Sequence, residues 1–117
     1  MSVSTKEAYA SFDGAWWIKH PKNYQMLNAV VRGNLREISI FCENVFEQVI
    51  DVPKRADIKY IMRSEGALAA CMSGSGPTVF GIFEQKSQAN SAARALAGTV
   101  AELFVTEPAQ NGVCRIQ

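Results

Sequence analysis

Residues 71–81 read CMSGSGPTVFG, a glycine- and serine-rich turn between two apolar runs. Glycine lets the backbone turn sharply and lets a ligand approach the main chain closely. Successive N–H groups in such a turn can point at one anion, and the hydroxyl groups of serine and threonine add further donors. The turn lacks the lysine that completes a P-loop. The stretch therefore predicts a phosphate-contacting turn whose positive charge comes from elsewhere.

The apolar runs on either side of this turn, residues 67–72 and 79–83, predict an antiparallel strand pair. A tight hairpin that needs glycine only for its backbone would have the same pattern. Residue chemistry alone favours that plainer interpretation of the turn, so the two alternatives stay open at this point.

Helical signals surround the strand pair. Ser4 and Glu7 fit a capping box at the start of the first helix. Asn34 can cap the strongest helix, in which apolar residues recur at spacings of three and four. The predicted helices cover residues 5–12, 23–33, 34–50, 53–64 and 87–97.

Two further strands are predicted near the end of the chain, at residues 101–106 and 113–116. Helices packed mainly on one face of a small antiparallel sheet give an α+β fold. The β-β-α-β order at the end resembles part of a ferredoxin-like split βαβ arrangement. A sheet this small has exposed edges, which favour a further strand or a partner.

Composition narrows the class of protein. The chain has 117 residues, 48% of them hydrophobic and 20% charged, with a net charge of +1, so we expect one globular domain over residues 1–117. The basic residues are dispersed, which argues against nucleic acid and anionic membranes. Cys42, Cys71 and Cys114 have no metal-ligand spacing, and Cys71 falls inside a predicted strand as a core thiol. Without a leader or transmembrane stretch, we expect a cytoplasmic protein that binds no metal through these residues.

Three segments together resemble one enzyme family. Residues 72–81 resemble the third conserved motif of the GHMP kinases, small-molecule kinases named for their galacto-, homoserine, mevalonate and phosphomevalonate members. The Gly76-Pro77-Thr78 form is most similar to the branch that phosphorylates 4-diphosphocytidyl-2-C-methyl-D-erythritol in non-mevalonate isoprenoid biosynthesis. Residues 3–9 resemble the segment that opens the C-terminal domain of that branch, and Asn44 to Glu47 resemble part of its long helix.

The resemblance covers only the family's C-terminal domain, and it begins after the first strand of that domain. It implies a ferredoxin-like GHMP-kinase C-terminal domain and transfer of the ATP γ-phosphoryl group to a substrate hydroxyl. The N-terminal domain, which holds most of the ATP with Mg²⁺ and supplies the catalytic groups, has no counterpart in this sequence. We therefore expect no catalytic residue in the chain and no activity from it alone.

The resemblance assigns phosphate or substrate contacts to Ser73, Gly74, Ser75, Gly76 and Thr5. Thr5 could equally be an ordinary first residue of a helix. Asn44 and Glu47 could face the interface with the other domain, but they are interpreted as ordinary polar positions on an amphipathic helix. Of the adjacent Trp16 and Trp17, one is expected to anchor its loop on the core and the other to be free for a partner or substrate.

Two alternative functions remain open at this point. The chain could belong to another GHMP kinase, such as a homoserine kinase, or it could be a stand-alone ferredoxin-like module for ligand binding or protein interaction. Under the kinase interpretation, the surface that faces the N-terminal domain would be exposed and apolar here, which predicts self-association of the isolated chain.

Overall fold

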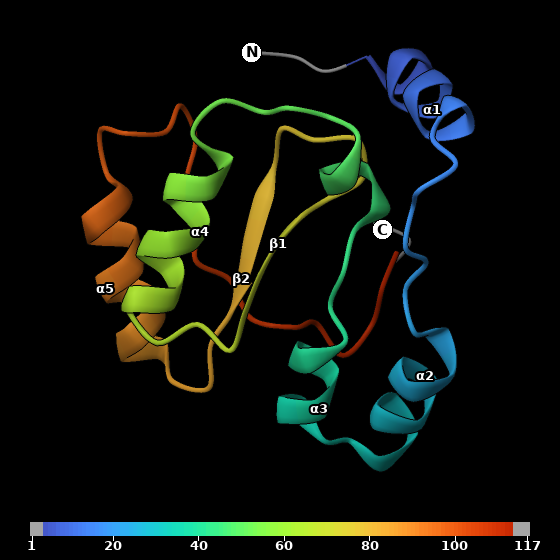
Figure 1. The fold of residues 1–117 in the computed structure, drawn as a ribbon. Coiled ribbons are helices and arrows are strands. Elements are labelled where there is room, and N and C mark those ends of the chain that lie inside the picture. Colours follow the sequence, from blue (N-terminus) through green and yellow to red (C-terminus); the bar gives the residue numbers. More distant parts are fainter. Residues whose placement is uncertain (1–3, 114–117) are drawn as a thin grey trace.

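The computed structural model describes residues 4–113 (Figure 1). Helices precede and follow a two-stranded sheet whose strands are consecutive in the chain. In chain order the elements are α1 (Thr5–Gly14), α2 (Asn23–Arg32), α3 (Leu35–Ile40), the 3₁₀ helix η1 (Val45–Gln48), α4 (Arg55–Ser64), β1 (Ala69–Met72), β2 (Val79–Ile82) and α5 (Lys86–Leu96). The fold is α+β with a small antiparallel sheet, as predicted. Among the described helices, none is long and apolar enough to cross a lipid bilayer.

The sheet is asymmetric in its burial. β1 and β2 pair antiparallel, with Ala69 opposite Ile82 and Met72 opposite Val79. Every residue of β1 is buried, whereas β2 is partly exposed along its length. α4 packs against both strands and α5 packs against α4, on one side of the sheet (Figure 1). The alanines of β1 and α5 leave room for this close packing, and they form much of the core.

Both predicted N-terminal helix caps are present. Ser4 accepts a hydrogen bond from the Glu7 amide at the start of α1, at 3.3 Å. Asn34 Oδ1 accepts from the Glu37 amide at the start of α3, at 3.1 Å. Each side chain satisfies a backbone donor that has no partner within its helix.

The predicted single helix over residues 34–50 is wrong, because the chain leaves the helix after Ile40. Asn44 adopts an extended conformation with φ −133° and ψ 115°. Its Oδ1 accepts a hydrogen bond from the Phe46 amide at 2.9 Å, two residues along the chain. Asparagine side chains compete in this way with helical hydrogen bonds, which explains the break. The chain then continues as η1.

The predicted strand at residues 101–106 is also wrong: these residues are irregular and exposed. A strand needs a hydrogen-bonded neighbour, and within the described part of the chain this segment pairs with none. Of the last predicted strand, residues 114–116 lie outside the described residues, and Val113 is not in a strand.

Candidate functional site

The turn at residues 73–78 closes the β1–β2 hairpin. The Ser73 amide donates to the Thr78 carbonyl at 2.8 Å, and the Gly76 amide donates to the Ser73 carbonyl at 3.1 Å. Gly74 has a φ of +56° and Gly76 a φ of +79°. A positive φ at the second position of a four-residue turn, without one at the third, is the pattern of type II′, which strongly favours glycine at the second position. The glycines are thus required by the backbone whatever else the turn does.

The polar groups of this turn divide into two sets. The carbonyl oxygens of Met72, Ser73 and Gly74 all accept hydrogen bonds from within the protein. By contrast, no described residue accepts a hydrogen bond from the amides of Gly74 and Ser75. Engaged carbonyls beside open amides form the arrangement that binds anions. Ser73 and Gly74 are exposed, so a ligand can reach them.

The structure brings Thr5 to the turn. Thr5 Oγ1 and Ser75 Oγ lie 3.2 Å apart in a hydrogen bond, across 70 residues of sequence. Thr5 is the first residue of α1, so the N-terminus of that helix also lies beside the turn. Helix N-termini present free amides and a partial positive charge. All five predicted site residues therefore lie together, although Thr5 comes from a different part of the chain.

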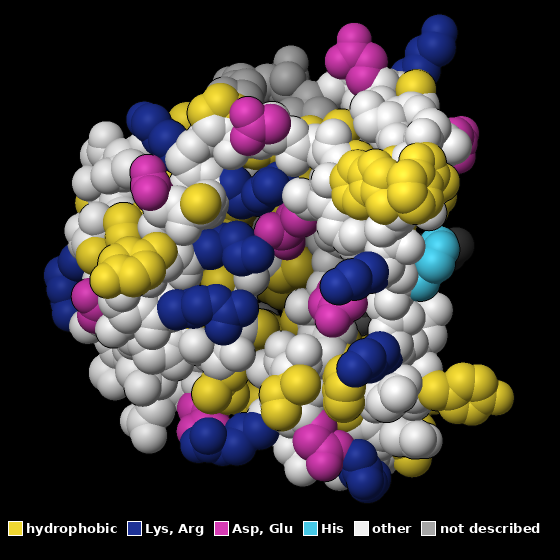
Figure 2. Space-filling model, in the orientation of Figure 1, with side chains coloured by type: hydrophobic (Ala, Val, Ile, Leu, Met, Phe, Trp, Pro, Cys, Tyr) yellow, Lys and Arg dark blue, Asp and Glu magenta, His cyan; other side chains and the backbone are white. Residues whose placement is uncertain are grey.

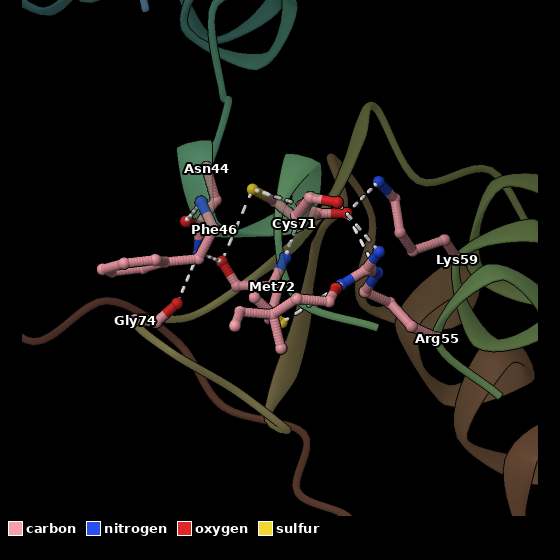
Figure 3. Close-up of polar contacts among 9 residues, drawn as sticks. Asn44, Phe46, Arg55, Lys59, Cys71, Met72 and Gly74 are labelled. Atoms are coloured by element: carbon pink, nitrogen blue, oxygen red, sulfur yellow. Dashed lines mark hydrogen bonds and ion pairs between the residues drawn. The ribbon is translucent and has the colours of Figure 1, made fainter. Parts of the chain in front are cut away.

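The Asn44 side chain bonds to the backbone of Met72 and of the turn (Figure 3). Its side-chain Nδ2 donates to the carbonyl of Met72 at 2.7 Å and to that of Gly74 at 2.8 Å. Its Oδ1 accepts from the Phe46 amide. One amide side chain thus bridges the last residue of β1 and the middle of the turn, and both of its ends are used.

Whereas Asn44 binds the carbonyl of Met72, Glu47 binds its amide. Glu47 Oε2 accepts from the Met72 amide at 3.0 Å and from Cys71 Sγ at 3.4 Å. Glu47 Oε1 pairs with Lys59 Nζ at 2.7 Å and with Arg55 Nε at 3.5 Å, both reaching in from α4 (Figure 3). These three charged side chains are only 15–28% exposed, so the ion pairs are weakly screened.

The strand register explains why Met72 needs such partners. Because Ser73 bonds to Thr78, the neighbouring pair of Met72 and Val79 is a non-hydrogen-bonded pair of the ladder. The amide and carbonyl of Met72 therefore point away from β2, toward the outer edge of β1. Glu47 and Asn44 take the place that a third strand would occupy there.

The charges in this cluster shift two pKa values. Burial acts to raise the pKa of Glu47, but hydrogen bonds from Lys59 and the Met72 amide and the charge of Lys59 outweigh it, so this pKa is lowered. Burial, and then the adjacent Glu47 carboxylate, raise the pKa of the Cys71 thiol to about 12. Cys71 is buried and protonated, which confirms its prediction as a core thiol.

The interpretation of Asn44 and Glu47 as ordinary positions on an amphipathic helix is therefore wrong. The signal that could have identified them is the Asn-x-x-Glu spacing, which resembles a capping pattern, within a segment that precedes Pro53. Only the fold could show that the partner of this pair is Met72, 25 residues beyond Glu47.

The prediction that one of the two tryptophans anchors their loop on the core is wrong. Trp16 is 93% exposed and Trp17 is 52% exposed, so neither anchors the loop in the core. Instead, Gln48 of η1 accepts from the Lys19 amide at 3.0 Å and donates to the Lys19 carbonyl at 2.8 Å. Trp17, Lys19 and Gln48 line an open cleft of about 640 Å³.

A second open groove, of about 500 Å³, runs beside the turn. Ser73 and Gly74 line one end of it, and Met26, Phe41 and Phe80 are among its apolar lining. Basic side chains flank the hollowed centre of the face in Figure 2, with acidic side chains between them.

Within residues 4–113, no group of three histidine, cysteine or acidic side chains is arranged to hold a metal ion.

Comparison with known proteins gives one family. The family model described as "GHMP kinases C terminal" matches residues 26–102. Among curated proteins, the chain is 39% identical over 111 residues to a 4-diphosphocytidyl-2-C-methyl-D-erythritol kinase of Caldicellulosiruptor saccharolyticus, covering 93% of this chain and 38% of the relative. It is 43% identical over 94 residues to the protein of the same name from Alkaliphilus oremlandii, covering 79% and 32%.

One solved structure agrees with these matches. It is a crystal structure of 4-(cytidine 5'-diphospho)-2C-methyl-D-erythritol kinase, with a TM-score of 0.61 and 26% identity. The match covers 82% of this chain and 35% of that one. The chain thus spans little more than a third of the length of the proteins it matches.

Proposed function

This chain belongs to the GHMP kinase C-terminal family, and from that premise we propose that it forms the C-terminal domain of an ATP-dependent 4-diphosphocytidyl-2-C-methyl-D-erythritol kinase. The names of its relatives support this substrate. The single observation that carries a role in phosphoryl transfer is the turn itself. The carbonyls of Met72, Ser73 and Gly74 accept hydrogen bonds, no described residue accepts from the amides of Gly74 and Ser75, and the Thr5 hydroxyl is bonded to Ser75.

The turn would act by positioning. Phosphoryl transfer needs reacting oxygens held in line and donors for the charge on the transferred group. The open amides and the hydroxyls of Thr5, Ser73 and Ser75 are neutral donors that fit phosphate oxygens. When ATP and Mg²⁺ are bound, they supply the phosphoryl group and the charge neutralisation. In this proposal their main ligands, and the groups that activate the acceptor hydroxyl, lie on an N-terminal domain.

A chimera tests the function. Residues 1–117 replace the part of the Caldicellulosiruptor saccharolyticus relative that they match, and ATP-dependent phosphorylation of 4-diphosphocytidyl-2-C-methyl-D-erythritol is measured. We expect activity from the chimera and none from the 117-residue chain alone. A folded chimera that is inactive, while the unaltered relative is active, would overturn the proposal. Phosphorylation of homoserine instead would move the chain to another branch of the family.

Two hydroxyl deletions test the turn within that chimera. We expect Ser75→Ala combined with Thr5→Ala to lower kcat/KM by about tenfold or more, because hydrogen bonds to charged groups contribute about 1.5–3 kcal/mol each. Ser87→Ala combined with Thr99→Ala is the matched control, since both residues are exposed and lie in or after α5. Equal kinetics for the two pairs would exclude the hydroxyls from the site.

Exposed apolar side chains on α2 and α3 support the proposal that a partner covers this surface. Tyr24 and Val31 of α2 and Ile40 of α3 are 69–81% exposed. We propose that the isolated chain self-associates through such residues, and that the assembled kinase is cytoplasmic, in keeping with the free thiols of Cys42 and Cys71. A clean monomer in sedimentation at high concentration would refute the self-association.

A further inference from the structure

We propose that Asn44, assisted by Glu47, is a positioning residue for phosphoryl transfer: it fixes the outer edge of β1 so that the amides of Gly74 and Ser75 are presented to the phosphate. This inference rests on the proposed function. Neither side chain offers a group to the ligand in this arrangement. Both act through the backbone of Met72, directly before the turn.

Met72 is held in place through its carbonyl, its amide and its side chain. Its carbonyl accepts from Asn44, its amide donates to Glu47, and its sulfur lies 3.6 Å from Arg55 Nη1. Met72 as a whole is 1% exposed. Arg55 is itself fixed, because it donates to the carbonyl of Ile50 at 2.8 Å and to that of Glu47 at 3.1 Å. The last residue of β1 therefore cannot shift without breaking several of these contacts.

Asn44 also fixes a backbone group inside the turn. Its Nδ2 joins the carbonyl of Met72 to that of Gly74, which lies two residues further on. Rotation of the Gly74–Ser75 peptide would move the Gly74 carbonyl and the Ser75 amide together, because the peptide unit is planar. Holding the Gly74 carbonyl inward therefore holds the Ser75 amide outward, which is the orientation that an anion requires.

The sharpest variant is Asn44→Asp, which is nearly isosteric. It replaces the donating Nδ2 by an oxygen that faces two carbonyl oxygens. Asn34→Asp is the matched control, because Asn34 uses only its Oδ1, to cap α3, and aspartate caps a helix equally well. Two readouts are compared: the amide signals of Gly74 and Ser75 in the nuclear magnetic resonance spectrum of the 117-residue chain, and the kinetics of the chimera.

We expect Asn44→Asp to shift the Gly74 and Ser75 signals and to lower kcat by about 100-fold, the scale of an ångström of misplacement at a reacting group. KM for ATP should change far less, because most ATP contacts lie on the other domain. Asn34→Asp should leave both readouts unchanged. If Asn44→Asp does not fold, Asn44→Ala removes the same donor without adding charge and is measured in the same way.

Unchanged Gly74 and Ser75 signals in the folded variant would overturn the inference. Shifted signals with a kcat equal to that of Asn34→Asp would overturn its catalytic part. An inactive unmutated chimera would instead overturn the proposed function, and the spectra would still decide whether Asn44 sets the turn. The two failures are therefore distinguishable.

Discussion

The two outer edges of this small sheet differ in whether side chains bind their backbone groups. At the outer edge of β1, Glu47 and Asn44 bind the amide and the carbonyl of Met72. At the outer edge of β2, no strand pairs with Val79 to Ile82 among the described residues. Open strand edges are ordinarily sites of unwanted pairing. The difference shows that the protein specifies the geometry of the edge that leads into the glycine turn with side chains rather than with another strand.

The largest effect should come from removing the carboxylate at the β1 edge. Glu47→Ala removes the carboxylate partner of Lys59, Arg55 and the Met72 amide in a mostly buried place. Arg55 keeps only its two backbone carbonyl acceptors and its contact with the Met72 sulfur. We expect the free energy of unfolding to fall by about 3 kcal/mol, the cost of breaking a buried pair. Urea denaturation of the 117-residue chain measures it.

Glu84→Ala is the control on the β2 side. Glu84 follows β2 and pairs with Arg36 at 3.2 Å, and both side chains are well exposed. Exposed pairs contribute about 0–1 kcal/mol, so this loss should be small. Equal losses for the two variants would show that the edges do not differ.

Glycine replacements give the next effect. A Cβ on Gly76 would lie 2.6 Å from Met72 Sδ, and the φ of +79° adds strain for any other residue. We expect Gly76→Ala to cost about 2 kcal/mol. Gly81→Ala in β2 is the comparison: its Cβ would meet the ends of the Phe83 and Met62 side chains at 2.9 and 3.0 Å, with no positive φ. Those flexible ends can move, so thermal unfolding should show a smaller loss for Gly81→Ala.

Alkaline pH tests the β1 edge through Cys71. The pKa of this thiol is raised to about 12 in the folded protein, against an ordinary cysteine pKa of 9.0. Above pH 9 the unfolded chain therefore loses a proton that the folded chain keeps, so stability falls as pH rises from 9 toward 12. The slope approaches about 1.4 kcal/mol per pH unit. Cys71→Ala should flatten this part of the curve; an unchanged slope would exclude Cys71 as its cause.

The sequence predicted the hairpin, the glycine turn and most of the helices because those signals are local. Alternation, capping residues and glycine act within a few positions of one another. The break after Ile40 and the irregular segment at 101–106 were missed for different reasons. The Asn44 side chain accepts a hydrogen bond from the Phe46 amide and so competes with the helix, although the apolar spacing continues through this position. Residues 101–106 have strand-forming residue types, but strand formation depends on a neighbour that the sequence pattern cannot supply.

The site divides in the same way. Ser73 to Gly76 are contiguous and were predicted as a unit. That Thr5 lies beside Ser75 follows from the resemblance to a family and not from spacing, since 70 residues separate them. The roles of Asn44 and Glu47 depend on which backbone groups of β1 face outward. That is a property of strand register, which no single segment encodes.

The smallest expected effect compares both edges within a single residue pair. Met72 and Val79 face each other, and neither bonds its amide to the opposite strand. The Met72 amide donates to the Glu47 carboxylate, whereas no described residue outside the sheet accepts from the Val79 amide. Hydrogen exchange of the 117-residue chain should therefore be about tenfold or more slower at Met72 than at Val79, the effect of one hydrogen bond to a charged group. Glu47→Gln retains an acceptor and should preserve much of this protection, while Glu47→Ala should abolish it. Equal exchange at the two amides of the unaltered chain would mean that the β1 edge is not fixed by side chains.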